Sequence, residues 1–206
     1  MTRIRLPFLS ACLIVSFLLV ALPSGRARAQ AVESASRVTE LSLFGAFQNL
    51  HPDWGHTSDN GLVAGALITH FMRGPILPSF EIRGSMSRNG EAAGMKTILY
   101  GGRANFRFPL VARFHPYANF LVGTGEIDFA HPTMTIRGPY GHDDSTVYNY
   151  GGGGEFAVHR NASLIAEFQQ QHWNLGGQEI GHVILTPYSV NLGLRYRIPF
   201  RAHNHR

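Results

Sequence analysis

Val190-Asn191-Leu192-Gly193-Leu194-Arg195-Tyr196-Arg197-Ile198-Pro199-Phe200 is the stretch with the clearest pattern in the chain. Apolar side chains occupy its even-numbered positions, whereas polar residues or glycine occupy positions 191, 193, 195 and 197. A period of two places these sets on opposite faces of a β-strand. Because two arginines on so apolar a strand need water or carboxylates beside them, the stretch predicts a strand with one apolar face and one charged face.

The same alternation recurs along the chain, separated by clusters of Gly, Pro, Asn and Asp. No segment after residue 37 has the periodicity of an amphipathic helix. This repetition indicates antiparallel β-structure with eight strands in all. Before the last strand, we predict strands at residues 38–48, 62–72, 79–87, 97–108, 116–129, 148–158 and 162–173.

The connections between these strands alternate in length. Short turns on one side and long loops on the other are typical of a transmembrane β-barrel, and an even number of strands brings both termini to the side of the short turns. We therefore predict an all-β fold, an eight-stranded antiparallel up-and-down transmembrane β-barrel. The longer loops are expected at 49–61, 88–94, 130–147 and 174–185, and the shorter turns at 73–78, 109–115 and 159–161.

A soluble barrel shows the same alternation with the opposite orientation, its apolar face inward and its charged face in water. Alternation alone leaves both orientations open. In a membrane barrel of eight strands, the polar interior is only wide enough for side chains. Charged residues of both signs lie opposite the apolar faces, and we predict that they form a paired network in the lumen: Glu40, Glu81, Arg83, Arg103, Arg107, Glu155, Glu167, Arg195 and Arg197.

The N-terminal segment has the pattern of a secretory signal peptide. Arg3 and Arg5 precede an apolar run from Leu6 to Leu22, and Ala27-Arg28-Ala29 supplies a cleavage site. We expect residues 1–29 to be removed by cleavage before Gln30, with Val32 as the second choice, and residues 30–206 to form the barrel domain. Cys12 is the only cysteine of the chain, so the mature protein has no disulfide and no thiolate metal ligand.

The charge balance excludes one class of partner. The whole chain has 18 basic and 13 acidic residues. Four of the arginines lie before the predicted cleavage site and no acidic residue does, which leaves 14 basic against 13 acidic residues, a net charge of +1. A mature domain so close to neutrality removes the main support for a nucleic-acid role, and we expect no nucleic-acid partner.

Three segments carry a resemblance to a known family. The C-terminal stretch, Pro116-Tyr117 followed by Gly123 and Gly125, and the run Tyr150-Gly151-Gly152-Gly153-Gly154-Glu155 resemble the small OmpA-like and opacity-type outer-membrane β-barrels. The resemblance implies a place in the bacterial outer membrane, with outer-membrane lipid and lipopolysaccharide around it. It also implies that the barrel-assembly machinery reads a C-terminal signal, made here of Asn191, Gly193, Tyr196, Ile198 and Phe200.

The main functional hypothesis is a structural or surface-interaction protein whose lumen is filled by the Arg/Glu network. A narrow porin-like channel for small solutes and a lipid A-modifying outer-membrane enzyme are the alternatives. His56-Thr57-Ser58 has part of the Ser-His-Glu spacing of lipid A deacylases, but the next glutamate is Glu81, too far along the chain to orient the histidine. We therefore predict no catalytic residue and no enzyme activity.

The remaining polar and aromatic residues do not indicate a functional site. Gly151 to Gly154 lack the helix and lysine that a phosphate-binding loop requires, so we expect no cofactor. Five histidines fall in predicted loops without the spacing of a preformed metal site, so no metal ligands are named: His51, His56, His131, His142 and His182. Trp54, Tyr140, Tyr148 and Trp173 lie near predicted strand ends, where an aromatic belt would contact lipid headgroups, and ordinary packing explains them nearly as well.

Overall fold

A computed structural model describes residues 39–53, 58–88, 93–108, 113–135, 138–175 and 183–199. The predicted signal peptide and its cleavage site lie outside these residues. The described residues contain no helix long and apolar enough to cross a membrane. They form nine strands: β1 (Thr39–His51), β2 (Asp59–His70), β3 (Ile76–Arg88), β4 (Ala93–Phe106), β5 (Phe114–Thr135), β6 (Gly138–Ala157), β7 (Ala162–Leu175), β8 (Val183–Leu185) and β9 (Tyr188–Arg197).

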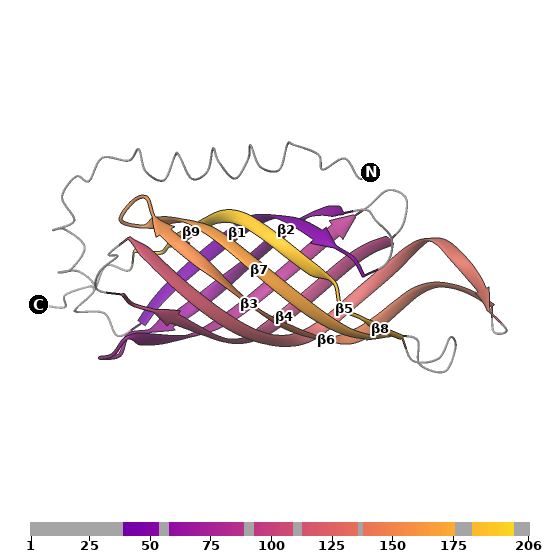
Figure 1. The fold of residues 1–206 in the computed structure, drawn as a ribbon, viewed down its shortest axis with the longest axis horizontal. Helices are drawn as coiled ribbons and strands as arrows, with labels where there is room; N and C mark the ends of the chain where they lie inside the picture. Colours follow the sequence, from indigo (N-terminus) through magenta and orange to yellow (C-terminus); the bar gives the residue numbers. More distant parts are fainter. Residues whose placement is uncertain are drawn as a thin grey trace, which may run out of the picture. The chain divides into compact units, whose positions relative to one another are not determined.

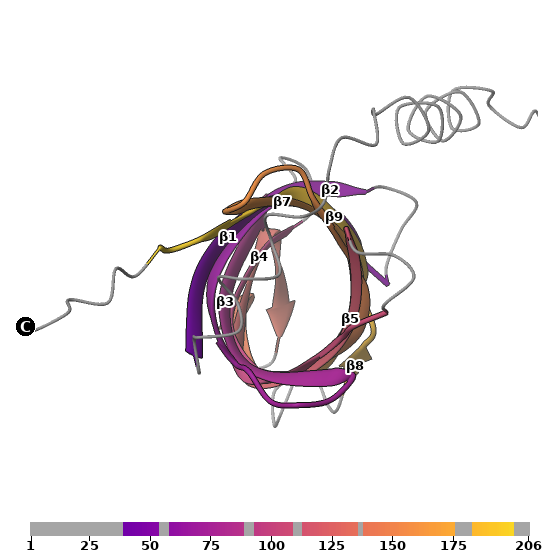
Figure 2. The ribbon, with the colours of Figure 1, turned by 90° about the vertical axis from the view of Figure 1, so that its left-hand side faces the viewer.

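The strands close into a barrel by antiparallel pairing between adjacent strands. Pairing runs from β1 through to β7, and β9 joins β7 to β1. The ring is visible in Figure 2. The predicted eight-stranded up-and-down barrel is confirmed, with one addition: β8 pairs with the end of β7 and is separated from β9 by Thr186 and Pro187. Because proline has no N–H group to donate, it interrupts the ladder there.

The barrel has two different ends. The end that holds Thr39 and Arg197, which we call the terminal end, is also where β2, β4 and β6 finish. The opposite end, the loop end, is where β1, β3, β5 and β7 finish. The long axis between the two ends runs across Figure 1.

The predicted loop at 130–147 is wrong in one respect, because most of it is strand. β5 continues to Thr135 and β6 begins at Gly138, so the two strands form a long hairpin. Pairing with β4 stops at Phe129, beyond which the hairpin projects from the barrel (Figure 1). The segment is rich in Gly, Pro and Asp, which favour turns. Pairing between the two strands overrides that local preference, as is common in sheets.

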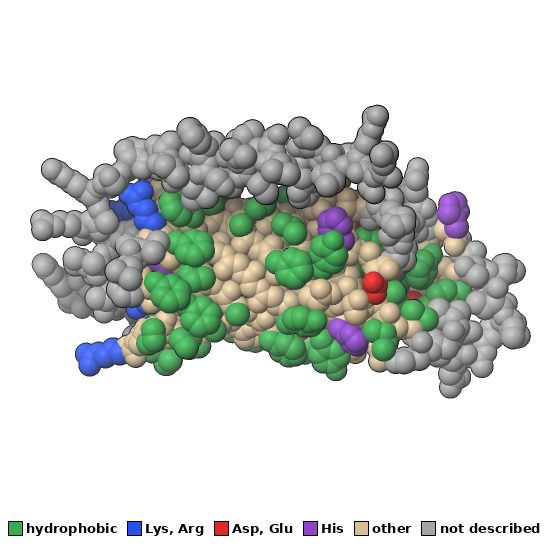
Figure 3. Space-filling model, in the orientation of Figure 1, with side chains coloured by type: hydrophobic (Ala, Val, Ile, Leu, Met, Phe, Trp, Pro, Cys, Tyr) green, Lys and Arg blue, Asp and Glu red, His purple; other side chains and the backbone are tan. Residues whose placement is uncertain are grey.

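The outer wall is apolar over the part of the barrel nearer the terminal end. Figure 3 shows apolar side chains over this wall, with the visible Lys and Arg side chains gathered at the terminal end. This is the polarity of a membrane-spanning barrel rather than of a soluble one. The outward-facing apolar side chains are between 47% and 64% exposed at Leu43, Phe47, Leu62, Ile68, Phe80, Ile82, Met86, Ile98, Tyr100, Phe120, Leu192, Leu194 and Tyr196.

Candidate functional site

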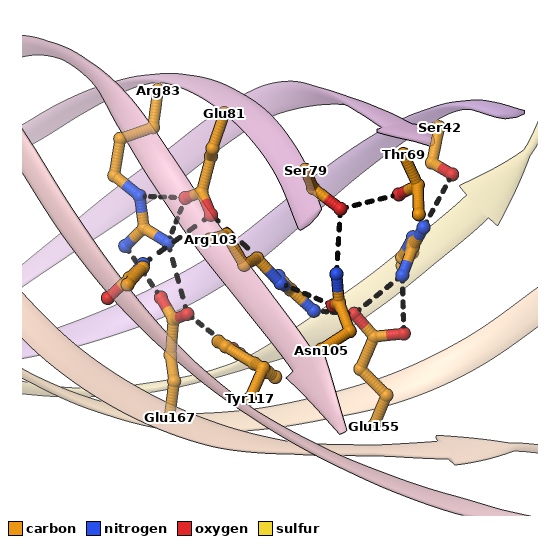
Figure 4. A network of polar contacts seen from close by, with 12 residues as sticks. Ser42, Thr69, Ser79, Glu81, Arg83, Arg103, Asn105, Tyr117, Glu155 and Glu167 are labelled. Atoms are coloured by element: carbon orange, nitrogen blue, oxygen red, sulfur yellow. Dashed lines mark hydrogen bonds and ion pairs between the residues drawn. The ribbon is translucent and has the colours of Figure 1, made fainter. Parts of the chain in front are cut away.

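Glu167 on β7 holds one half of a buried network inside the barrel. Its carboxylate accepts two hydrogen bonds from Arg83 on β3, of 2.8 and 3.1 Å. It also accepts one from the Tyr117 hydroxyl of β5, at 2.6 Å, and one from the Asn191 amide of β9, at 2.8 Å. Arg83 in turn donates from Nε to Glu81 at 2.6 Å. Glu167 therefore ties three other strands together across the lumen (Figure 4).

Glu155 on β6 holds the other half, nearer the terminal end. Arg195 on β9 donates to both of its oxygens, at 2.8 and 2.6 Å, and Arg103 on β4 donates to one of them. Arg195 also reaches β1, where its second nitrogen lies 3.0 Å from Glu40 and 2.9 Å from the Ser42 hydroxyl. Both carboxylates thus have two or more donors, as buried charges require.

Arg103 joins the two halves into one ion-pair network. Its Nη1 lies 3.8 Å from Glu81, its Nε donates to Asn105 at 2.8 Å, and its guanidinium lies 3.4 Å from the centre of the Tyr117 ring. Asn105 donates to Ser79 at 2.7 Å, and Ser79 donates to Thr69 of β2 at 2.8 Å. The network therefore touches every strand of the closed ring.

The charges of the network balance. Three arginines and three glutamates have side chains no more than 5% exposed: Arg83, Arg103, Arg195, Glu81, Glu155 and Glu167. Arg197 and Glu40 form a further pair, 3.4 Å apart and less buried, at the terminal end. Balanced charges avoid the several kcal/mol that an unpaired buried ion costs.

One residue of the predicted lumen set lies elsewhere. Arg107 is exposed, with its guanidinium 5.3 Å from the centre of the Phe71 ring, because it lies just beyond the end of β4, at the edge of the barrel. The sequence did not predict that neutral side chains belong to the network. Their position was a usable signal, since Asn105 is in phase with Arg103, and Asn191 with Arg195.

The interior of the barrel is polar in its middle and becomes apolar toward the loop end, where apolar side chains fill it. Trp173 is fully buried there and donates from its indole N–H to Gln171 at 2.9 Å. Of the two interpretations of the aromatic residues, packing holds for Trp173 and Tyr140, whose side chains are buried, and the aromatic belt does not. Tyr148 faces outward, and Trp54 lies outside the described residues. This apolar cluster consists of Leu50, Met95, Leu99, Leu121, Ile127, Val147, Trp173 and Leu175.

The outer face of the wall changes from apolar to polar along a strand such as β5, and the inner face changes from polar to apolar. The alternation of inward and outward residues continues unbroken through this change. On β5, outward Phe120 lies in the apolar part of the wall, and the same face then carries Thr124, Glu126 and Asp128. The inward face changes in the opposite sense, from Asn119 to Ile127. Apolar outside and polar inside suits lipid, whereas polar outside and apolar inside suits water. We infer from this reversal that the lipid-facing part of β5 ends near Val122 and Thr124.

The C-terminal signal predicted from the family resemblance lies on β9 and just beyond it. Asn191 and Gly193 face the lumen and Tyr196 faces outward, while Phe200 lies outside the described residues. A Cβ atom at Gly193 would lie 2.1 Å from the carbonyl oxygen of Gly45 and 2.5 Å from Cα of Ala46. Glycine thus lets β9 approach β1 closely where the barrel closes. His56, Thr57 and His182 also lie outside the described residues.

Comparison with known proteins supports the fold. No protein-family model matches the sequence, and no curated protein matches it. Among solved structures, Neisserial surface protein A is 14% identical with a TM-score of 0.51, over 79% of this chain and 98% of that one. The attachment invasion locus protein Ail of Yersinia pestis is 16% identical with a TM-score of 0.46, over 78% of this chain and 97% of that one. The chain has the fold of the small outer-membrane β-barrels.

Proposed function

We propose that this chain is a non-enzymatic outer-membrane barrel whose strands anchor it, whose lumen is closed, and whose loop end meets molecules outside the cell. The ion-pair network is the observation that carries the proposal. Its arginines and glutamates reach across the lumen, their neutral hydrogen-bond partners extend the network to the remaining strands of the ring, and the apolar cluster lies beyond them. An eight-stranded interior of this kind leaves no room for a steady water-filled channel.

The placement in the membrane is supported by the polarity of the wall. The apolar outer face ends near Val122 and Thr124, and the β5–β6 hairpin continues past that level with polar residues outside. In outer-membrane barrels the longer connections face the exterior and the short turns face the periplasm. The hairpin is then the part of the chain best placed to contact an external partner.

The C-terminal strand is the proposed assembly signal. It closes the ring between β1 and β7, and its outward residues Leu192, Leu194 and Tyr196 are more than half exposed, as lipid-facing side chains are. The same outward faces would contact outer-membrane lipid and lipopolysaccharide. Recognition by the barrel-assembly machinery is the role that the family resemblance gives to Asn191, Gly193, Tyr196, Ile198 and Phe200.

Cysteine labelling in whole cells tests the orientation. The mature chain is expected to contain no cysteine, so Asp144→Cys on the hairpin and His159→Cys at the terminal end each introduce one thiol. A membrane-impermeant maleimide should label Asp144→Cys in intact cells, and His159→Cys only after the outer membrane is permeabilised. Equal labelling of both variants in intact cells, or recovery of the protein outside the outer-membrane fraction, would contradict the proposal.

A further inference from the structure

A charged group on the outside of the wall takes no part in the ion-pair network. It lies beyond the apolar outer face, toward the loop end, on three adjacent strands: Lys96 on β4, Glu126 and Asp128 on β5, and His142 on β6. Lys96 is the strand partner of Glu126, and Asp128 is the strand partner of His142. Their side chains are between 42% and 53% exposed, so the group is open to ions from solution.

Three atoms of this group that could bind a metal ion lie close together. Nδ1 of His142 lies 2.8 Å from Oδ1 of Asp128 and 3.6 Å from Oε1 of Glu126. One ligand atom from each residue lies within 4.8 Å of the other two. Pairing in the sheet fixes the backbone at all three positions, so the group is held together before any ion arrives.

Lys96 is the cation that these carboxylates now contact. Its Nζ lies 3.0 Å from Oδ2 of Asp128 and 3.5 Å from Oε1 of Glu126. The hydrogen bonds from His142 and Lys96 hold the pKa of Asp128 below its usual value, and the hydrogen bond to Asp128 raises the pKa of Lys96. Both carboxylates therefore already have Lys96 as a cationic partner, and Asp128 also contacts the imidazole of His142.

We propose that Glu126, Asp128 and His142 form a binding site for a divalent transition-metal ion such as Zn²⁺. One imidazole nitrogen and two carboxylate oxygens are ligands that Zn²⁺ accepts, and three protein ligands leave the fourth tetrahedral position to water or to an external anion. The ion would replace Lys96, whose flexible side chain can turn away into solvent. The ligands are on neighbouring strands, which is why spacing within single segments did not reveal them.

Zn²⁺ titration of the folded protein in detergent micelles, followed by calorimetry without chelator, tests the site. We expect one Zn²⁺ per chain, and His142→Ala should weaken binding at least about tenfold, as loss of groups at a metal site commonly does. Lys96→Met should tighten binding by about tenfold, because a positive charge a few ångströms from the ion is removed. Folding of each variant is checked by heat-modifiable migration on gels.

His131→Ala is the matched control, since His131 is an exposed histidine of β5, outside the converging group. Its Zn²⁺ affinity should equal that of the unaltered protein. Absence of binding below a dissociation constant of about 1 mM, or equal loss in His131→Ala and His142→Ala, would overturn the proposal. Because the site lies outside the lumen, these results do not depend on whether the barrel conducts ions.

Discussion

The indole ring of Trp173 occupies the space that a side chain at Gly125 would fill. A Cβ atom at position 125 would lie 2.2 Å and 2.4 Å from two atoms of the ring. Trp173 is fully buried and belongs to the apolar cluster that fills the loop end of the lumen. The packing of this end of the lumen thus depends on a glycine of β5, which is separated from the tryptophan of β7 by one strand.

Gly125→Ala should destabilise the folded barrel by about 1 to 3 kcal/mol, because the added methyl group forces the indole to move in a packed interior. The free energy of unfolding in urea, measured in detergent micelles, checks this. Gly102→Ala is the matched control, since nothing lies within 4 Å of the Cβ position there. Equal stability of the two variants would mean that the loop end of the lumen is loosely packed.

Arg103→Ala should destabilise the barrel by about 3 to 5 kcal/mol, because Glu155 and Glu81 remain buried with fewer cationic partners. Urea unfolding again provides the measurement. Arg107→Ala removes the same side chain four residues later, where it is exposed, and should change the stability by less than about 0.5 kcal/mol. Similar losses in the two variants would argue against a network that stabilises the fold.

The boundary inferred from the wall predicts different outcomes for two substitutions on the same face of β5. Phe120→Arg places a charge in the lipid-facing wall and should cost up to about 2 to 4 kcal/mol, with less folded protein in the membrane. Thr124→Arg lies four residues farther toward the loop end and should fold normally. Heat-modifiable migration gives the folded fraction, and normal folding of Phe120→Arg would place the lipid boundary elsewhere.

Closure of the ring depends on Gly193, where a Cβ atom would meet the backbone of Gly45 and Ala46. Gly193→Ala should therefore lower the yield of folded barrel. At Gly84 the nearest atom to a Cβ lies at 3.7 Å, an ordinary contact, so Gly84→Ala should fold as the unaltered protein does. A comparison of the two yields in the outer-membrane fraction checks the prediction, which fails if both variants fold equally well.

Alternation along the sequence predicted which side chains face inward, but it did not predict their partners. Glu81, Arg83 and Glu167 share the inward face, as period two requires. The contact between Arg83 and Glu167 joins residues 84 apart, and it depends on closure and register that local pattern does not contain. Which inward side chains meet across the lumen is determined by the pairing of all the strands in the ring.

The alternation of β7 and the distance of Trp173 from a strand end indicate different positions for this residue. It is in phase with Glu167 and Gln169, so the alternation of β7 already placed it inside. The aromatic-belt argument uses only distance from a strand end, and it is wrong here because β7 extends past the membrane, where the inner face becomes apolar. The β5–β6 hairpin differs from the predicted loop for a related reason. Its Gly, Pro and Asp residues favour turns, but pairing between the two strands beyond the lipid-facing wall tolerates them.

We propose that the ion pairs and the apolar cluster together close the lumen. Planar-bilayer recording from the purified, folded protein tests it most directly. We expect no steady conductance from the unaltered barrel, because Arg83, Arg103 and Arg195 are held by carboxylates across the lumen and Trp173 lies packed beyond them. A large and steady conductance from that same protein would contradict the account and favour a pore.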